Sequence, residues 1–271
     1  MDISRRDPAV AGAFYGATAA ALEHELRDLV ATDENRHPLL ACVAPHAGYV
    51  YSGRVAGALY GHLEVPQRVI VLGPNHTGSG AALAVAPHER WRTPIGDVPI
   101  DTVLARKLVD RAYAATFDPR AHLREHSLEV QLPFLLARRP DLEVLPVCLA
   151  HLRLEDCLEL GRVLAKLISD HTEPIGIVAS SDMSHYLVDA DARRLDRLAI
   201  DAMLALDPVG LYETVHREGI TMCGVVPATV ALEAANRLGA SGAHLVAYAT
   251  SGDVSGDRNA VVGYAGICVH R

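Results

Sequence analysis

The chain has 271 residues, of which 50% are hydrophobic and 21% charged, a composition typical of a folded globular protein. Its formal net charge of −8 argues against nucleic acid as a partner, because binding to phosphates depends on positive charge. No apolar run approaches the roughly 18 residues that cross a bilayer, and the N-terminus lacks a signal-peptide core, so no membrane association is expected. The five cysteines show no CxxC spacing, which favours reduced thiols and a cytoplasmic location.

Apolar, β-rich runs alternate with amphipathic helical patterns along the chain. The predicted strands are 39–45, 68–74, 82–87, 143–149, 174–180, 244–250 and 259–267. The predicted helices are 17–32, 52–62, 101–115, 126–138, 154–170, 189–205, 208–217 and 226–238. Residues 77–100 are rich in glycine and proline, and we expect a hairpin over the sheet edge there. The alternation predicts an α/β fold with a mostly parallel or mixed sheet flanked by helices on both faces. No linker interrupts it, so we predict a single domain over residues 1–271.

Polar side chains follow three of the predicted buried strands. His46 comes directly after the first strand, His76 after the second, and Asp182 and His185 after the strand at 174–180. A single histidine in such a place is commonly a hydrogen-bonded turn residue. Because parallel strands end on the same side of a sheet, the repetition favours one shared polar site instead.

Two imidazoles with an anionic third ligand suit a divalent transition metal such as iron, zinc or copper. Either a carboxylate or a thiolate could serve as the third ligand. Cys223 directly precedes a helix that is predicted to begin near Val226, where the helix dipole lowers the pKa of a thiol. The alternative is a small buried cysteine that packs at the helix start. The other four cysteines lie in predicted strands or helices and are interpreted as core residues.

The stretch "REHSLEVQLPFL" contains two further titratable residues. Glu125 and His126 are predicted to open the helix at 126–138, where the helix dipole accounts for the glutamate without a site. His126 has no such explanation and remains a site candidate. Serines surround Asp182 and His185, but no GxSxG hydrolase motif and no phosphate-binding loop occurs. The remaining histidines include four that are interpreted as incidental surface residues: His24, His37, His171 and His270.

Six motifs in order resemble the MEMO family (mediator of cell motility; AmmeMemoRadiSam system protein B) over residues 8–267: "APHAGYVYSG", "LGPNHTG", "EHSLEVQLPFL", "SSDMSHY", "CG" before a helix, and "TSGDVSGD…AVVGYAGI". The resemblance implies a fold like that of the class III non-heme iron extradiol dioxygenases. It implies that His46, His76 and Cys223 are metal ligands, with Asp182, His185 and His126 beside them. It further implies iron or copper binding, redox chemistry, and association with radical SAM and AMMECR-type proteins.

Our leading hypothesis is therefore a metal-dependent, dioxygenase-like oxidoreductase that acts on a small-molecule substrate with dioxygen. Fe(II) is the expected metal, and Cu or Zn are the alternatives. His185 would act as general acid or base, oriented by Asp182 or another carboxylate, and His126 would donate to substrate or oxygen. Nearby tyrosines would line the pocket or simply pack: Tyr49, Tyr51 and Tyr186. The competing hypotheses are a non-catalytic metal- or peptide-binding protein and, more weakly, a zinc-dependent hydrolase.

Overall fold

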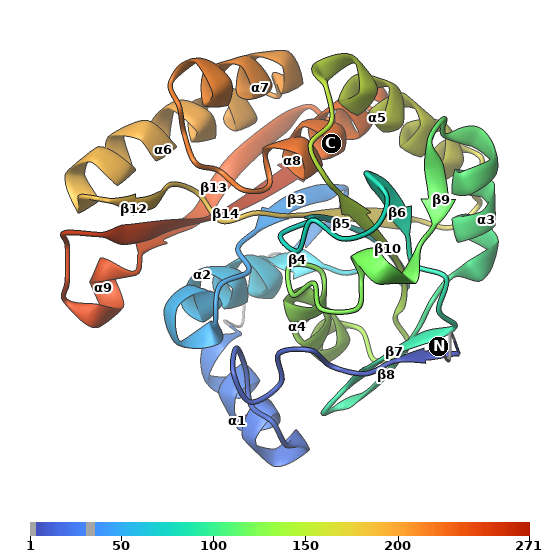
Figure 1. Cartoon of the computed structure of the whole chain (residues 1–271), viewed down its shortest axis with the longest axis horizontal. Coiled ribbons are helices and arrows are strands. Elements are labelled where there is room, and N and C mark those ends of the chain that lie inside the picture. Colours follow the sequence, from blue (N-terminus) through green and yellow to red (C-terminus); the bar gives the residue numbers. More distant parts are fainter. Residues whose placement is uncertain (1–3, 31–35) are drawn as a thin grey trace.

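Four parallel strands form the centre of the molecule (Figure 1). The computed structural model describes residues 4–30 and 36–271. The central strands lie side by side in the order β3 (Ala41–Ala44), β11 (Ile175–Ser180), β5 (Arg68–Pro74) and β10 (Glu143–Leu149). They are almost entirely apolar and buried, as strands covered on both faces are expected to be.

Antiparallel strands extend this centre on both sides. Beside β3 lies β14 (Val261–His270), which also pairs with β13 (Gly242–Thr250) and β12 (His185–Leu187). Beside β10 lies β6 (Leu83–Val85), which pairs in parallel with β9 (Ala115–Phe117). The described residues thus form a nine-stranded mixed sheet, which confirms the predicted fold class.

Helices cover the sheet on both faces (Figure 1). One face carries α1 (Ala19–Leu29), α2 (Tyr49–His62) and α4 (Leu132–Arg138). The other carries α3 (Thr102–Arg111), α5 (Leu154–Ser169), α6 (Asp189–Leu204), α7 (Pro208–Arg217) and α8 (Val225–Arg237). Alternate strand residues supply the two cores, as the two-residue period of a strand requires: in β5, Ile70 and Leu72 face one, Val69 and Val71 the other.

The remaining elements are short. The segment at 77–100 does form the expected hairpin, β7 (Arg90–Thr93) with β8 (Gly96–Pro99), but it joins β1 (Arg5–Arg6) in a separate small sheet. A second small sheet pairs β2 (His37–Pro38) in parallel with β4 (Leu63–Glu64). One-turn helices complete the fold: η1 (Pro119–Ala121), η2 (Glu129–Gln131) and α9 (Gly252–Ser255). Over the residues described, no helix has the length and apolar character needed to cross a bilayer.

Two helix starts differ from the prediction. Helix α2 begins at Tyr49 rather than near Ser52, because the Ser52 N–H already bonds to the Gly48 carbonyl in the helical manner. The helix predicted at 126–138 begins only with η2 at Glu129. The carboxylate of Glu125 accepts the backbone N–H of Ser127, and this bond holds the preceding residues in a loop.

Candidate metal centre

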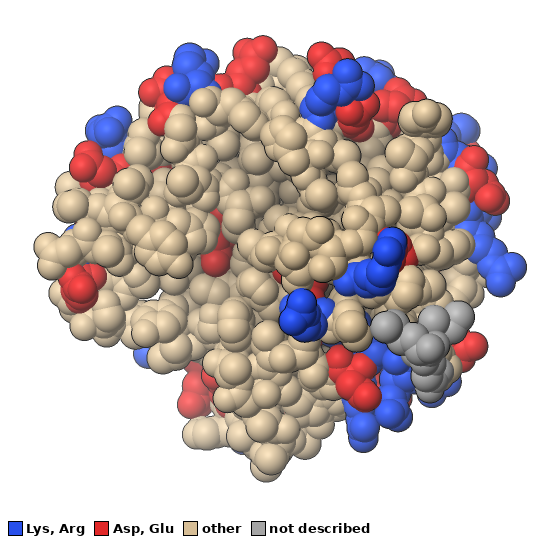
Figure 2. Space-filling model, in the orientation of Figure 1, with Lys and Arg blue, Asp and Glu red and all other residues tan. Residues whose placement is uncertain are grey.

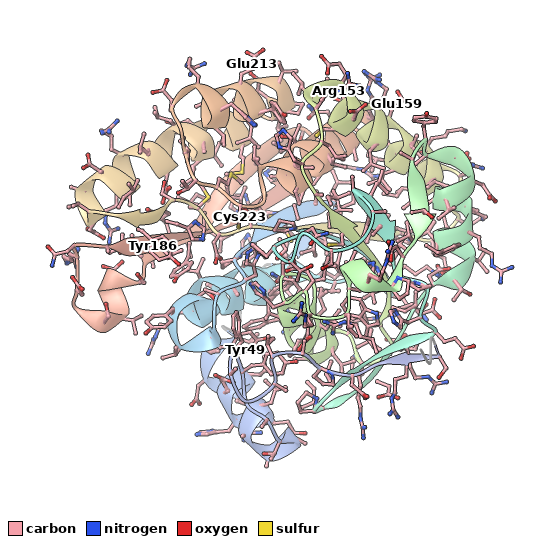
Figure 3. All side chains as sticks on the ribbon, in the orientation of Figure 1. Tyr49, Arg153, Glu159, Tyr186, Glu213 and Cys223 are labelled. Atoms are coloured by element: carbon pink, nitrogen blue, oxygen red, sulfur yellow. The ribbon has the colours of Figure 1, made fainter. Side chains whose placement is uncertain are left out.

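Three neighbouring strand ends and one helix start converge on a single place. His46 follows β3, Asp182 follows β11 and His76 follows β5, and these three strands are adjacent in the sheet. Cys223 reaches the same place from the loop before α8, and Figure 3 shows it near the middle of the molecule. One potential ligand atom from each of His46, His76 and Cys223 lies within 4.8 Å of the other two. The three predicted ligands therefore meet.

His46 is held in one tautomer by a network of hydrogen bonds. Its Nδ1 lies 2.8 Å from the Oγ of Ser180, which donates to the carbonyl of Ser127 at 2.7 Å and accepts from Nε2 of Gln131 at 2.8 Å. Since the one hydroxyl proton of Ser180 is already engaged, Nδ1 of His46 must be the donor in their contact. Its Nε2 is then an unprotonated lone pair, 3.2 Å from the Sγ of Cys223.

The sulfur of Cys223 is fixed by a close approach of two backbones. The Gly224 N–H donates to the Oγ of Ser181 at 3.0 Å, and a Cβ at Gly224 would lie 2.4 Å from the carbonyl oxygen of Ser180. Only glycine leaves room for this contact. The Asp182 N–H donates to the sulfur at 3.3 Å.

The expectation that the helix start lowers the pKa of Cys223 is wrong. Burial raises the pKa of this thiol well above its ordinary value, with the Asp182 charge adding to the effect. Removal of the sulfur from water destabilises the thiolate more than the helix dipole stabilises it. Burial also lowers the pKa of His46, aided by the neighbouring His76 and His126 rings. Without a metal, the thiol thus donates to a neutral imidazole.

Glu125 orients the second imidazole. Its side chain is fully buried, its Oε1 lies 2.9 Å from Nδ1 of His76, and its Oε2 accepts the His76 backbone N–H at 2.6 Å. Burial acts to raise the pKa of Glu125, but the bonds from His76 and Ser127 outweigh it and hold the pKa at about 2. The carboxylate stays ionised and leaves Nε2 of His76 as the ring nitrogen available to a ligand. The interpretation that the helix dipole alone accounts for Glu125 was wrong.

His126 lies directly against this pair. Its ring is stacked on His76, with centroids 4.7 Å apart and an interplanar angle of 18°, and Phe14 covers it at 4.8 Å. Its Nδ1 is 3.5 Å from Oε1 of Glu125. Burial lowers the pKa of His126, although the Glu125 charge opposes the shift. The structure thus places His126 in the cluster, on a loop rather than at a helix start.

Asp182 lies beside the cluster as expected, with its Oδ2 4.0 Å from Nε2 of His46, but it does not orient His185. Asp182 is buried, and its Oδ1 accepts the backbone N–H groups of His46 at 2.7 Å and Ala47 at 3.3 Å, so it anchors the turn after β3. Burial raises the pKa of Asp182 to about 6. Nδ1 of His185 instead lies 2.9 Å from the Thr221 carbonyl, which can only accept. A backbone carbonyl, and not the predicted carboxylate, therefore makes Nδ1 of His185 the donor and leaves Nε2 as the nitrogen that can exchange a proton.

The three tyrosines divide into two groups. Tyr49 is buried and donates to the Val130 carbonyl at 2.6 Å, so it is a core aromatic. Tyr51 is 41% exposed and Tyr186 is 77% exposed. Figure 3 shows Tyr186 at one end of the molecule, well to the left of Cys223. In the same orientation, charged side chains gather along the upper rim over α5, α6 and α7, and fewer of them lie in the middle of this face (Figure 2).

Four supporting residues were not selected from the sequence: Glu125, Ser180, Gln131 and Thr221. Glu125 is next to His126, and Ser180 is two residues before Asp182 in the same motif. Gln131 lies in the motif that contains His126, and Thr221 is two residues before Cys223, but neither was assigned a role. The four other cysteines are buried and free, as predicted: Cys42, Cys148, Cys157 and Cys268.

With this geometry in place, the comparisons with known proteins decide the family. The model of the family described as "Memo-like protein" matches residues 6–268. The chain belongs to the Memo-like family. A "MEMO1 family protein" of Aquifex aeolicus is 44% identical over 266 residues, covering 97% of this chain and 98% of the relative. One of Methanosarcina mazei is 43% identical over 266 residues, with the same coverage of 97% and 98%. The resemblance inferred from the six motifs is thereby confirmed.

The fold also has a relative among solved structures. The crystal structure of an uncharacterized protein from Escherichia coli K12 superposes with a TM-score of 0.53 and covers 85% of this chain and 99% of its own. At 15% sequence identity this likeness supports the architecture of the Memo-like chain and nothing further.

Proposed function

We propose that this Memo-like protein is a cytoplasmic, metal-dependent oxidoreductase that holds Fe(II) through His46, His76 and Cys223. One observation carries the proposal: three ligand atoms lie within 4.8 Å of one another, and separate partners orient both imidazoles. Imidazole and thiolate donors fit iron, and also fit copper and zinc, which are the alternatives. When bound, iron would supply one-electron redox chemistry and the activation of dioxygen.

Residues of this chain would orient the metal ligands and transfer protons at this centre. Ser180 and Glu125 fix the orientation of the His46 and His76 rings. The two imidazoles therefore need little reorientation when a metal binds. Cys223 must give up its thiol proton to become a ligand. Nε2 of His185 is free to accept or deliver a proton, because Nδ1 is occupied by the Thr221 carbonyl.

The metal is tested by elemental analysis of untagged protein purified without air. We expect near-stoichiometric iron in the wild type, lost in both Cys223→Ser and His46→Ala. His171→Ala, which changes a histidine remote from the centre, should keep it. Stoichiometric zinc or copper in place of iron would overturn the assignment of the metal. Metal undisturbed by both ligand substitutions would overturn the site itself.

Catalysis is tested separately with an oxygen electrode and a panel of phenolic and thiol substrates. We expect His185→Gln to keep its iron and lose oxygen uptake, because the substitution removes the proton-accepting nitrogen. Equal uptake by the wild type and this variant would exclude the proposed role of His185. Tight metal binding with no uptake on any substrate would favour non-catalytic metal binding. Zinc with ester hydrolysis would favour a hydrolase.

A further inference from the structure

Four histidines lie close together near the amino end of β3, at the opposite end of the strands from the first centre. His37 lies on β2, His62 ends α2, His244 lies on β13 and His270 ends β14. Nε2 of His62 lies 2.8 Å from Nε2 of His244. One potential ligand atom each of His37, His62 and His244 lies within 4.8 Å of the other two. The structure thus places His37 and His270, which were interpreted as incidental surface residues, in one group of histidines.

Strand pairing brings these residues together from distant parts of the chain. The parallel pairing of β2 with β4 places His37 opposite Leu63, directly after His62. The pairing of β13 with β14 places Gly242 opposite His270 and His244 opposite Cys268. The rings are close: His37 lies 4.7 Å from His62 and 5.3 Å from His244, centroid to centroid.

The chemistry of this cluster differs from that of the first centre. Its three converging donors are all imidazoles, and the His270 ring lies 5.4 Å from that of His244 and 5.6 Å from that of His37. Burial, followed by the neighbouring histidines, lowers the pKa of His244 and favours the neutral form that binds metal.

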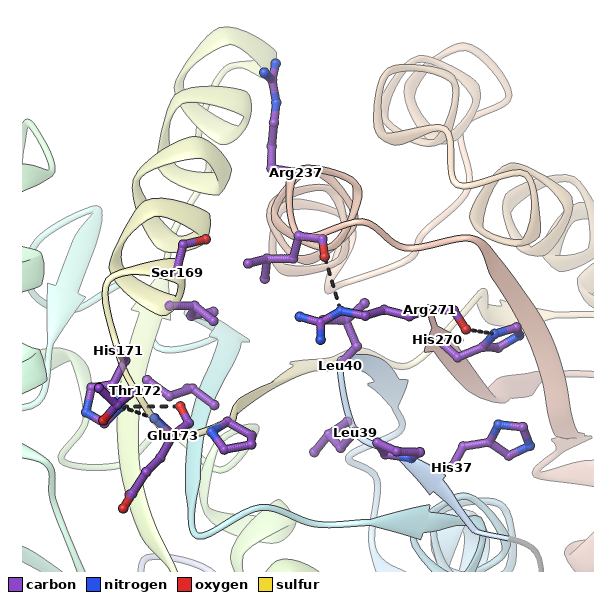
Figure 4. Close-up of a pocket in the computed structure, with 15 residues that line it drawn as sticks. His37, Leu39, Leu40, Ser169, His171, Thr172, Glu173, Arg237, His270 and Arg271 are labelled. Atoms are coloured by element: carbon purple, nitrogen blue, oxygen red, sulfur yellow. Dashed lines mark hydrogen bonds between the residues drawn. The ribbon is translucent and has the colours of Figure 1, made fainter.

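The cluster is also accessible. His37, His62 and His244 are each only partly buried. A cavity of about 670 Å³ opens beside them, and its lining includes His37, His270, Leu39 and Arg271. Figure 4 shows the His37 and His270 rings next to each other on one side of this cavity, away from His171 and Glu173. The cavity thus reaches the cluster at His37 and His270.

We propose that His37, His62 and His244 form a second metal site, made of imidazole alone, for a divalent transition-metal ion such as Zn²⁺. His270 stands beside it as a further imidazole. Neutral imidazole is a ligand suited to zinc, copper and nickel, and three such ligands are enough for an open zinc site. The site is independent of the proposed function, because it shares no residue with the first centre and lies at the other end of helix α2.

The test uses untagged full-length protein in which Cys223→Ser and His76→Ala have removed the first centre. Equilibrium dialysis against Zn²⁺, followed by elemental analysis, measures what remains. We expect stoichiometric zinc in this background, and its loss when His62→Gln and His244→Gln are added. His24→Ala, a matched change of an exposed histidine, should leave zinc bound. Zinc should also raise the melting temperature of the background protein and not that of the cluster variants.

Two results would overturn the proposal. One is a background protein that takes up no zinc; the other is zinc uptake that is unchanged by the His62 and His244 substitutions, which would mean adventitious binding. His37→Ala on the short strand β2 provides a second test if the double substitution disturbs folding. It should weaken zinc binding about tenfold or more, and unchanged binding would equally contradict the site.

Discussion

The two histidine clusters lie at opposite ends of the same helix and are built differently. Helix α2 begins just after His46 and ends at His62, and its 14 residues span about 20 Å. At the first centre, a hydroxyl, a carboxylate and a carbonyl each orient one imidazole, and a half-buried thiol lies 3.2 Å from Nε2 of His46. At the second cluster the Nε2 atoms of His62 and His244 face one another, and the His37 ring lies against both. The first centre thus combines imidazoles with a thiol and a carboxylate, and the donors of the second are imidazoles.

The largest expected effect comes from Gly224→Ala. The new Cβ would lie 2.4 Å from both the Ser180 carbonyl oxygen and the Cβ of Ser181, so the Cys223 loop must move away from β11. We expect the free energy of unfolding to fall by about 1–3 kcal/mol and the first centre to lose its metal. Denaturant unfolding and metal analysis measure the two effects. Unaltered metal content would show that the close approach does not position Cys223.

Glu125→Gln should weaken the first centre by about 10–100-fold in metal affinity. The carboxylate accepts three N–H groups, from His76 N, His76 Nδ1 and Ser127 N. An amide has only one acceptor oxygen, so its NH₂ group must face one of these donors. Competition with a metal indicator measures the affinity. Zinc binding at the second cluster serves as the internal control and should not change. Equal weakening of metal binding at both sites would indicate a general loss of structure.

Ser180→Ala should have a smaller effect, about tenfold in metal affinity at the first centre. It leaves Nδ1 of His46 and the amide of Gln131 without their shared acceptor. The cost in folding free energy should be about 1–3 kcal/mol, as for buried donors left unpaired. The same indicator assay and thermal unfolding measure both quantities. An affinity equal to that of the wild type would mean that Ser180 does not set the tautomer of His46.

Proton release separates the two sites without disturbing either. At pH 8, Zn²⁺ binding to the first centre should release about one proton, because the raised pKa keeps Cys223 protonated until the metal binds. Binding to the second cluster should release fewer protons, since that cluster contains no thiol and the lowered pKa of His244 favours its neutral ring. Calorimetry in buffers of different ionisation enthalpy counts these protons. Equal release at the two sites would contradict the thiol ligand.

The sequence predicted the fold and the convergence of His46, His76 and Asp182 because both follow from local pattern. Buried apolar strands of the right length predicted β5 and β10 to the residue, and the carboxyl ends of parallel strands led to His46, His76 and Asp182. Cys223 was promoted to a ligand only by the family resemblance, since nothing local separates it from a packed cysteine.

The second cluster escaped prediction because its geometry is entirely non-local. His37 and His270 meet only through the register of β2 with β4 and of β13 with β14, and no motif marks either pairing. The rise in the pKa of Cys223 was also invisible, because burial of the sulfur depends on the contact between Gly224 and β11. Glu125 was misjudged because the predicted helix start lay too early in the chain.

The most direct test of the central claim is the absorption spectrum of the protein loaded with Co²⁺. Cobalt bound through Cys223 must show a thiolate-to-metal charge-transfer band in the near ultraviolet, which an imidazole-only site lacks. We predict this band in the wild type and in the His62→Gln, His244→Gln variant, and its absence in Cys223→Ser. A band that persists in Cys223→Ser, or a wild type that shows none, would contradict the assignment of His46, His76 and Cys223 as a metal centre.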